Sequence, residues 1–104
     1  MDDNYVVLNA DIYNYDVWLP FTDSIRLITE LGALLEEAGF TIVNFIEHQF
    51  PVEGFTCVWL LSESHLAVHT FPMDDKSYIQ LSSCSLEKKN KFEALITSNY
   101  YKTK

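Results

Sequence analysis

The chain has 104 residues, 48% of them hydrophobic and 14% aromatic, which supplies the core of one domain and argues against disorder. Its formal net charge of -8 disfavours nucleic acid and anionic lipid as partners, and no apolar run approaches the roughly 18 residues that cross a membrane. We therefore expect a single cytoplasmic domain over residues 1–104 that acts on a small molecule rather than on nucleic acid or a membrane.

The first half of the chain predicts a strand, a helix and a second strand. Tyr5 to Ile12 has the composition of a strand. Beyond Pro20, the run Thr22-Asp23-Ser24 offers N-cap oxygens to a helix that ends at Gly39. The apolar residues of this helix recur at helical spacing and are Ile25, Ile28, Leu31, Leu35 and Ala38. Thr41 to Phe50 is rich in β-branched and aromatic residues and predicts the next strand.

The second half predicts three more strands and a last helix. Phe55 to Leu61 is almost continuously apolar, so we expect a central strand. A turn through Ser62-Glu63-Ser64 leads to a short strand from His65 to Thr70, and a strand from Tyr78 to Cys84 follows a loop. Ser85 then caps the last helix. The apolar side of that helix comprises Leu86, Phe92, Leu95 and Ile96.

The order of these elements is a strand, a helix, four strands and a helix. It indicates an α+β fold, a two-layer sandwich in which two helices cover one face of a largely antiparallel sheet. Two helices leave the other face of the sheet uncovered. A second copy of the chain is the natural cover for that face, so we expect a homodimer.

Two cysteines, Cys57 and Cys84, occur without a CxxC motif or a histidine spacing suited to zinc. We therefore expect free thiols and no metal site. Cys57 lies in an apolar run and is expected to be a small buried hydrophobe. Cys84 lies among serines, so a role as a buried hydrophobic residue explains its presence less well.

The chemistry is concentrated in one stretch, Leu60 to Pro72. In a strand, His65 and His69 point to one face and the residues that alternate with them point to the other. Two histidines beside a turn that ends in Ser64 put a hydroxyl near potential proton carriers. The same pattern also fits a turn serine followed by two half-buried structural histidines, and the G-x-S-x-G elbow of a hydrolase is missing.

The run Glu63-Ser64-His65 followed by His69-Thr70-Phe71-Pro72 resembles the processing site of the short prokaryotic S-adenosylmethionine decarboxylases. The likeness covers most of the chain. Asp11-Ile12-Tyr13 resembles the first-strand motif of that family, and residues 48–51 and 54–56 resemble its second hairpin. Cys84 stands where the family has its catalytic cysteine. The resemblance implies the α+β fold of these decarboxylases and a proenzyme that cleaves itself.

For Ser64, the resemblance implies self-processing. The Ser64 hydroxyl attacks the carbonyl of Glu63 and turns the peptide bond into an ester, and His69 then assists β-elimination. The chain is thereby split into residues 1–63 and 64–104, and residue 64 becomes a covalent pyruvoyl group, the implied cofactor. Thr56 stands where the family has a serine implicated in processing. Because a peptide bond is normally inert, the turn must hold the hydroxyl close to the carbonyl and strain the bond.

The resemblance also implies the reaction of the processed chain. The pyruvoyl group forms a Schiff base with the amine of S-adenosylmethionine and accepts electrons as carbon dioxide leaves. Cys84 then donates a proton to the resulting carbanion. The decarboxylated product would serve polyamine synthesis, in particular that of spermidine.

The substrate contacts depart from the pattern of the family. Phe50 stands where an aromatic ring stacks on adenine. Met73 replaces the glutamate that holds the ribose hydroxyls, and Asp74, one residue later, is the candidate substitute. Ser85 replaces a glycine beside Cys84. Two alternatives therefore stay open: a pyruvoyl-dependent arginine or ornithine decarboxylase of the same family, and an unprocessed, non-catalytic paralogue that binds a partner subunit.

Overall fold

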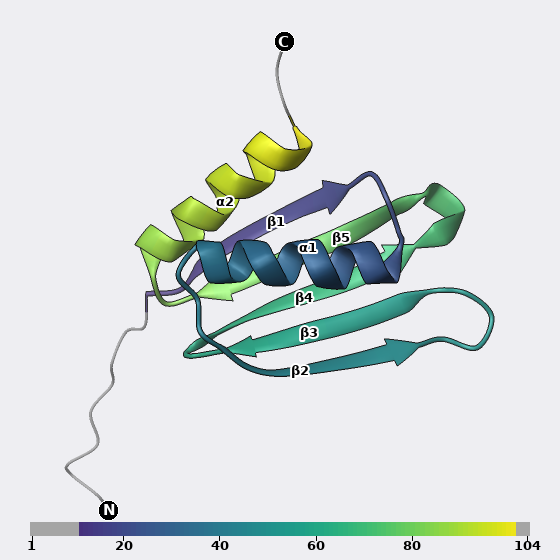
Figure 1. Cartoon of the computed structure of the whole chain (residues 1–104), viewed down its shortest axis with the longest axis horizontal. Helices are drawn as coiled ribbons and strands as arrows, with labels where there is room; N and C mark the ends of the chain where they lie inside the picture. The colour runs from purple at the N-terminus through teal and green to yellow at the C-terminus, as the bar shows by residue number, and fades with distance from the viewer. Residues whose placement is uncertain (1–10, 102–104) are drawn as a thin grey trace, which may run out of the picture.

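The computed structural model describes residues 11–101, which form a single sheet with two α-helices and one short 3-10 helix (Figure 1). In chain order the elements are β1 (Tyr13–Leu19), α1 (Ser24–Glu37), β2 (Ile42–Gln49), β3 (Phe55–Leu61), β4 (Ser64–Phe71), η1 (Pro72–Asp74), β5 (Lys76–Ser83) and α2 (Leu86–Tyr100). The order of strands and α-helices is the predicted one, and the α+β class is confirmed.

The first described strand, β1, begins directly after the segment predicted to be a strand. The expected strand from Tyr5 to Ile12 falls outside the described residues, except for Asp11 and Ile12, which precede β1 and belong to no strand. In β1 the side chains alternate between exposed and partly buried, and the last one, Leu19, is fully buried. Asparagine and aspartate on the exposed side of β1 lower its strand propensity, so composition favoured the more apolar segment before it.

Helix α1 begins and ends where the sequence predicts. Asp23 is its N-cap, and the Oδ1 atom of Asp23 accepts hydrogen bonds from the backbone N–H groups of Ile25 at 3.0 Å and Arg26 at 3.3 Å. After the C-cap residue Ala38, Gly39 has a φ of 100°, a conformation that glycine adopts without strain. The buried face of the helix consists of Leu27, Leu31, Leu34 and Leu35.

All strand pairs in the described sheet are antiparallel, and the strand order is β1-β5-β4-β3-β2. The middle strand is therefore β4. The expectation that Phe55 to Leu61 is a central strand is confirmed in that β3 is an inner strand, with β4 on one side and the edge strand β2 on the other. Along β4, Leu66 and Val68 are fully buried on one face, whereas His65 and Phe71 are exposed on the other.

Both helices lie on the same face of the sheet, and the hydrophobic core fills the space between the two layers (Figure 1). Phe92 and Ile96 of α2 are fully buried, and Leu95 packs against the same core, as predicted. Leu86 does not belong to this apolar side. Leu86 is the first residue of the helix and is 47% exposed.

No described element covers the opposite face of the sheet. That face carries two large apolar side chains, Ile46 and Leu60, which are 64% and 49% exposed. It also carries an aromatic cluster in which the Trp18 ring packs against Phe71 and Tyr78, with centroid separations of 5.5 and 5.2 Å. Exposed apolar and aromatic side chains on one face of a sheet are typical of protein interfaces.

Candidate active site

Ser64 is the first residue of β4 and follows a two-residue turn formed by Ser62 and Glu63. The turn connects Leu61 of β3 with Ser64, and these two residues are paired across the strands. Glu63 has a φ of 60°, in the left-handed region, which costs a residue with a side chain about 1–2 kcal/mol. The backbone is therefore strained on the carbonyl side of the Glu63–Ser64 peptide bond, the bond that the sequence predicts to be cleaved.

This turn opens onto a cavity of about 330 Å³. Ser64 lines the cavity together with Glu63, His65 and Cys84, the last of which follows β5. The other lining residues are Ile12, Leu60, Leu61, Ser82 and Ser83. The predicted nucleophile of self-processing and the predicted proton donor of decarboxylation therefore share one cavity, although they are twenty positions apart in the sequence. The pairing of β4 with β5 brings them together, because Ser64 is paired with Ser83, the residue before Cys84.

The two cysteines lie in different surroundings. Cys57 is 1% exposed, and burial, with a smaller contribution from the charge of Glu47, raises the pKa of its thiol to about 12. A thiol with so high a pKa stays protonated and unreactive at neutral pH, so the prediction that Cys57 is a buried hydrophobe is confirmed. Cys84 is exposed at the mouth of the cavity. Only Cys84 is therefore accessible for chemistry.

Thr56 and His69 form a pair on the sheet face opposite the helices. They face each other across β3 and β4, and Thr56 Oγ1 lies 3.0 Å from His69 Nδ1 in a hydrogen bond whose donor depends on the tautomer of the ring. Within residues 11–101, no other side-chain hydrogen bond engages His69. The pairing fixes the orientation of the imidazole through its Nδ1 atom.

A second cavity, of about 390 Å³, brings together the two predicted substrate-binding residues, Phe50 and Asp74. Met73 also lines it and is 89% exposed. Sequence reasoning missed two polar lining residues, Glu53 and Thr70. The remaining lining residues are Val52, Gly54, Phe71 and Pro72. The signal for Glu53 is the turn between β2 and β3, because that hairpin and the β4–β5 loop end on the same side of an antiparallel sheet.

The ring of Phe50 is held in place by the hairpin that carries it. The Phe50 backbone N–H donates a hydrogen bond of 3.0 Å to the carbonyl of Gly54, and the Phe50 ring packs edge-on against His48 with centroids 4.6 Å apart. Gly54 has a φ of 108°, a conformation that residues with a side chain rarely adopt. A residue other than glycine would therefore strain the turn that positions this aromatic platform.

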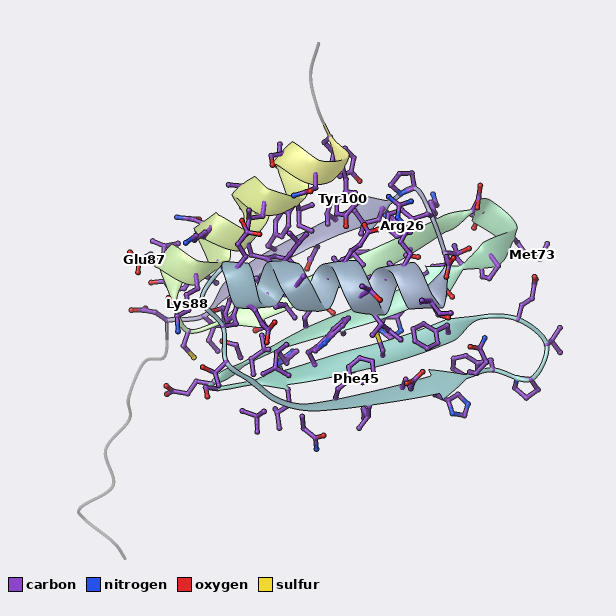
Figure 2. The ribbon with its side chains drawn as sticks, in the orientation of Figure 1. Arg26, Phe45, Met73, Glu87, Lys88 and Tyr100 are labelled. Atoms are coloured by element: carbon purple, nitrogen blue, oxygen red, sulfur yellow. The ribbon has the colours of Figure 1, made fainter. Side chains whose placement is uncertain are left out.

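The two cavities lie at opposite ends of the molecule. Figure 1 shows the β3–β4 turn at one end of the sheet and the β2–β3 and β4–β5 connections at the other. In Figure 2, Met73 marks the second end, and Glu87 and Lys88, at the start of α2, mark the first. Cys84 and α2 lie close together in sequence, so the Ser64 cavity belongs to the end that Lys88 marks.

Within one chain, Ser64 and His69 do not meet. They are five residues apart on β4, which at about 3.4 Å per residue separates their Cα atoms by roughly 17 Å. They also point to opposite faces, Ser64 toward the helices and His69 away from them. The expectation that the serine turn places its hydroxyl beside both histidines therefore fails for His69 in the single chain, and only His65 shares the cavity with Ser64.

Residues 11–101 contain no group of three or more histidine, cysteine, aspartate or glutamate side chains placed to hold a metal ion. Within the same range, no helix has the length and apolar character needed to span a membrane.

Comparisons with known proteins agree with this geometry. The family model described as S-adenosylmethionine decarboxylase matches residues 8–101. The chain is 36% identical over 62 residues to the S-adenosylmethionine decarboxylase proenzyme of Prochlorococcus marinus (strain MIT 9313), a match that covers 60% of this chain and 50% of the relative. It is 38% identical over 78 residues to the proenzyme of Thermotoga petrophila, which covers 74% of this chain and 58% of that relative. The chain thus spans about half the length of the curated relatives it matches.

A solved structure supports the fold. The crystal structure of the adenosylmethionine decarboxylase from Aquifex aeolicus VF5 resembles the chain with a TM-score of 0.67 and 22% sequence identity, over 88% of this chain and 82% of that one. The shared fold is the five-stranded antiparallel sheet with two helices described above. Because the family model matches nearly the whole chain, the chain belongs to the S-adenosylmethionine decarboxylase family.

Proposed function

We propose that this chain is a proenzyme that cleaves itself between Glu63 and Ser64 and then decarboxylates S-adenosylmethionine. The observation that supports it most directly is the placement of Ser64 directly after a strained residue, in a cavity that it shares with Cys84. The names of the relatives support the substrate, since each is an S-adenosylmethionine decarboxylase proenzyme. They do not favour the arginine or ornithine decarboxylase, nor the unprocessed paralogue.

In self-cleavage, the Ser64 Oγ atom attacks the carbonyl carbon of Glu63. The C–N bond of the peptide breaks, the proton of the hydroxyl ends on the freed nitrogen, and Glu63 is left as an ester. Removal of the Cα proton of residue 64 then breaks the Cβ–O bond, releases Glu63 as a carboxylate and leaves dehydroalanine at residue 64. Water hydrolyses the imine form of this residue, which leaves the pyruvoyl ketone and releases the nitrogen as ammonia. The single domain would thus become two fragments, residues 1–63 and 64–104.

The cavity at Ser64 fits a pyruvoyl group derived from that residue. When present, such a group would supply a ketone for attachment to the amine of the substrate and an adjacent, conjugated carbonyl as the sink for the electron pair left by departing carbon dioxide. Cys84 lines the same cavity, and its exposed thiol is a reasonable acid for protonating a carbon of the substrate there.

Replacing Cys84 with alanine should separate the two stages. We expect Cys84→Ala to cleave itself normally, because the thiol acts only after carbon dioxide leaves, and to lose about 10²- to 10⁴-fold in decarboxylation rate. The measurements are a gel for cleavage and carbon dioxide release for turnover. Ser82→Ala, a change in the same cavity, is the matched control and should retain turnover. Undiminished turnover in Cys84→Ala would assign the proton to another group.

We further propose that two chains form a homodimer and that each active site combines residues of both. Ser64 and Cys84 lie at one end of the sheet, while the Thr56–His69 pair and the Phe50 cavity lie toward the other. One complete site therefore needs Ser64 and Cys84 from one chain and the Thr56–His69 pair with the Phe50 cavity from the other. The uncovered apolar face of the sheet supplies a surface on which a second chain could pack in the required reversed orientation.

For the substrate, we propose that the Phe50 cavity holds the nucleoside and that Asp74 replaces the carboxylate lost at Met73. Phe50 offers an aromatic face, and Asp74 and Glu53 offer carboxylates within the same cavity. Among residues 11–101, ion pairs form only between Arg26 and Glu30 and between Lys89 and Glu93, so both cavity carboxylates keep their acceptor capacity.

Asp74→Ala should therefore raise the KM for S-adenosylmethionine about tenfold or more, because a charge-assisted hydrogen bond contributes about 1.5–3 kcal/mol. Met73→Glu should be tolerated or should lower the KM. Asp75→Ala, which changes the next acidic residue but lies outside the cavity, is the control. The assay should compare S-adenosylmethionine with arginine and ornithine. Turnover of arginine or ornithine alone would refute the proposed substrate while leaving the chemistry at Ser64 intact.

A further inference from the structure

The hydroxyl of Ser64 belongs to a short chain of hydrogen bonds that the sequence did not predict. Ser64 Oγ donates to Ser83 Oγ at 3.1 Å. Ser83 Oγ in turn donates to the carbonyl of Ser85 at 3.3 Å and accepts the backbone N–H of Ser85 at 3.0 Å. Ser83 is 1% exposed, so water does not compete for these bonds.

Both ends of this chain are fixed by the fold. Ser64 and Ser83 are direct partners across β4 and β5, on the face toward the helices, and such a pair keeps its Cβ atoms about 4.5–5.5 Å apart. At the other end, Ser85 is the N-cap of α2, and its Oγ accepts the backbone N–H of Lys88 at 3.2 Å. The start of the helix therefore holds Ser85, and Ser85 holds the hydroxyl of Ser83.

We infer that Ser83 is a positioning residue for the self-cleavage at Ser64, an inference that rests on the proposed function. Because the proton of Ser83 is committed to the Ser85 carbonyl, the Ser83 oxygen can only accept from Ser64. The Ser64 hydroxyl is thereby held in one rotamer with its own proton turned toward Ser83. A lone pair of Ser64 Oγ then remains free to form the bond to the Glu63 carbonyl carbon.

This role makes a specific prediction for the first chemical step. As the Ser64 Oγ–carbon bond forms and the peptide C–N bond breaks, the hydroxyl proton passes to the freed nitrogen of residue 64. Ser83 takes no covalent part in that transfer and sets only the starting geometry. Loss of its hydroxyl should therefore slow formation of the ester but should leave β-elimination from a formed ester unaffected.

The test is the rate of self-cleavage of freshly translated full-length chain, followed on a gel. Ser83→Ala should slow cleavage about ten- to a hundredfold, and Ser83→Thr, which keeps the hydroxyl, should restore it to near the wild-type rate. Ser77→Ala is the matched control, because Ser77 is another fully buried serine on the same face of β5 and bonds the Phe21 carbonyl, away from Ser64. Thermal unfolding of each variant shows that it is folded.

Treatment with hydroxylamine distinguishes positioning from a merely structural role, because hydroxylamine cleaves esters and leaves peptide bonds intact. Added hydroxylamine should not speed the release of fragments from Ser83→Ala, in which formation of the ester is slowed. It should speed their release from His69→Ala, in which the ester forms but is not eliminated. Equal cleavage rates in Ser83→Ala and wild type would overturn the inference and leave the proposed function standing. Equal slowing in Ser77→Ala, or failure of a folded Ser83→Thr to recover, would also overturn it. A wild-type chain that never cleaves would refute the proposed function itself.

Discussion

Chains carrying Ser64→Ala and chains carrying His69→Ala should each remain uncleaved alone, and cleavage should reappear when the two are co-expressed. The reason is that, within one chain, the Cα atoms of Ser64 and His69 are roughly 17 Å apart and their side chains lie on opposite faces of the sheet. If the site is built from two chains, a mixed dimer contains one site with both Ser64 and His69 and one site with neither.

The mixed dimer also predicts which chain is cut. Only the His69→Ala chain still has Ser64, so that chain should yield residues 1–63 and 64–104, and the Ser64→Ala chain should stay whole. Affinity tags of different mass distinguish the two on a gel. Co-expression of Ser64→Ala with a chain that carries both substitutions is the control, and it should give no cleavage.

Cleavage of the His69→Ala chain by itself, at a rate near that of the wild type, would remove His69 from the processing step. Absence of cleavage in a mixed dimer whose formation is verified by pull-down would contradict the composite site. The homodimer would then need another arrangement, in which Ser64 receives its proton carrier from its own chain. His65 is the candidate in that case, because it shares the Ser64 cavity.

Ser64→Ala alone should abolish activity. Without the hydroxyl no ester forms, so the chain stays at its full 104 residues and no pyruvoyl group arises. Decarboxylation should fall by at least about 10³-fold, as expected when a residue indispensable to a catalytic unit is removed. Ser62→Ala is the matched control. Ser62 lies in the same turn, its side chain is exposed, and its backbone N–H bonds the Thr41 carbonyl at 3.1 Å, a bond that alanine keeps.

Much of the fold could be predicted because local signals agree with the tertiary structure. The cap at Asp23, the stop at Gly39 and the apolar spacing between them define α1 without reference to the rest of the chain. The first described strand, β1, could not be placed in the same way. The alternation in β1 has polar residues on its exposed side, and its strand character comes from pairing with β5.

The candidate site was likewise predictable where the signal is local and unpredictable where it depends on strand pairing. Ser64, His69 and Cys84 were found from a linear motif, but only the sheet register reveals that Ser64 and Cys84 share a cavity and that His69 lies away from it. Ser83 and Glu53 were missed for the same physical reason. Ser83 acts with Ser64 and Glu53 shares its cavity with Asp74, so the role of each becomes evident only when the strand order and the positions of the turns are known.

The mass of the purified wild-type protein tests the central claim most directly. Self-cleavage predicts two fragments, residues 1–63 with a free carboxyl terminus and residues 64–104 with a blocked amino terminus. The second fragment should be lighter than the product of simple hydrolysis by one molecule of ammonia, which is lost when residue 64 becomes a pyruvoyl group. An intact chain after prolonged incubation, or a second fragment that begins with unmodified Ser64, would contradict the account.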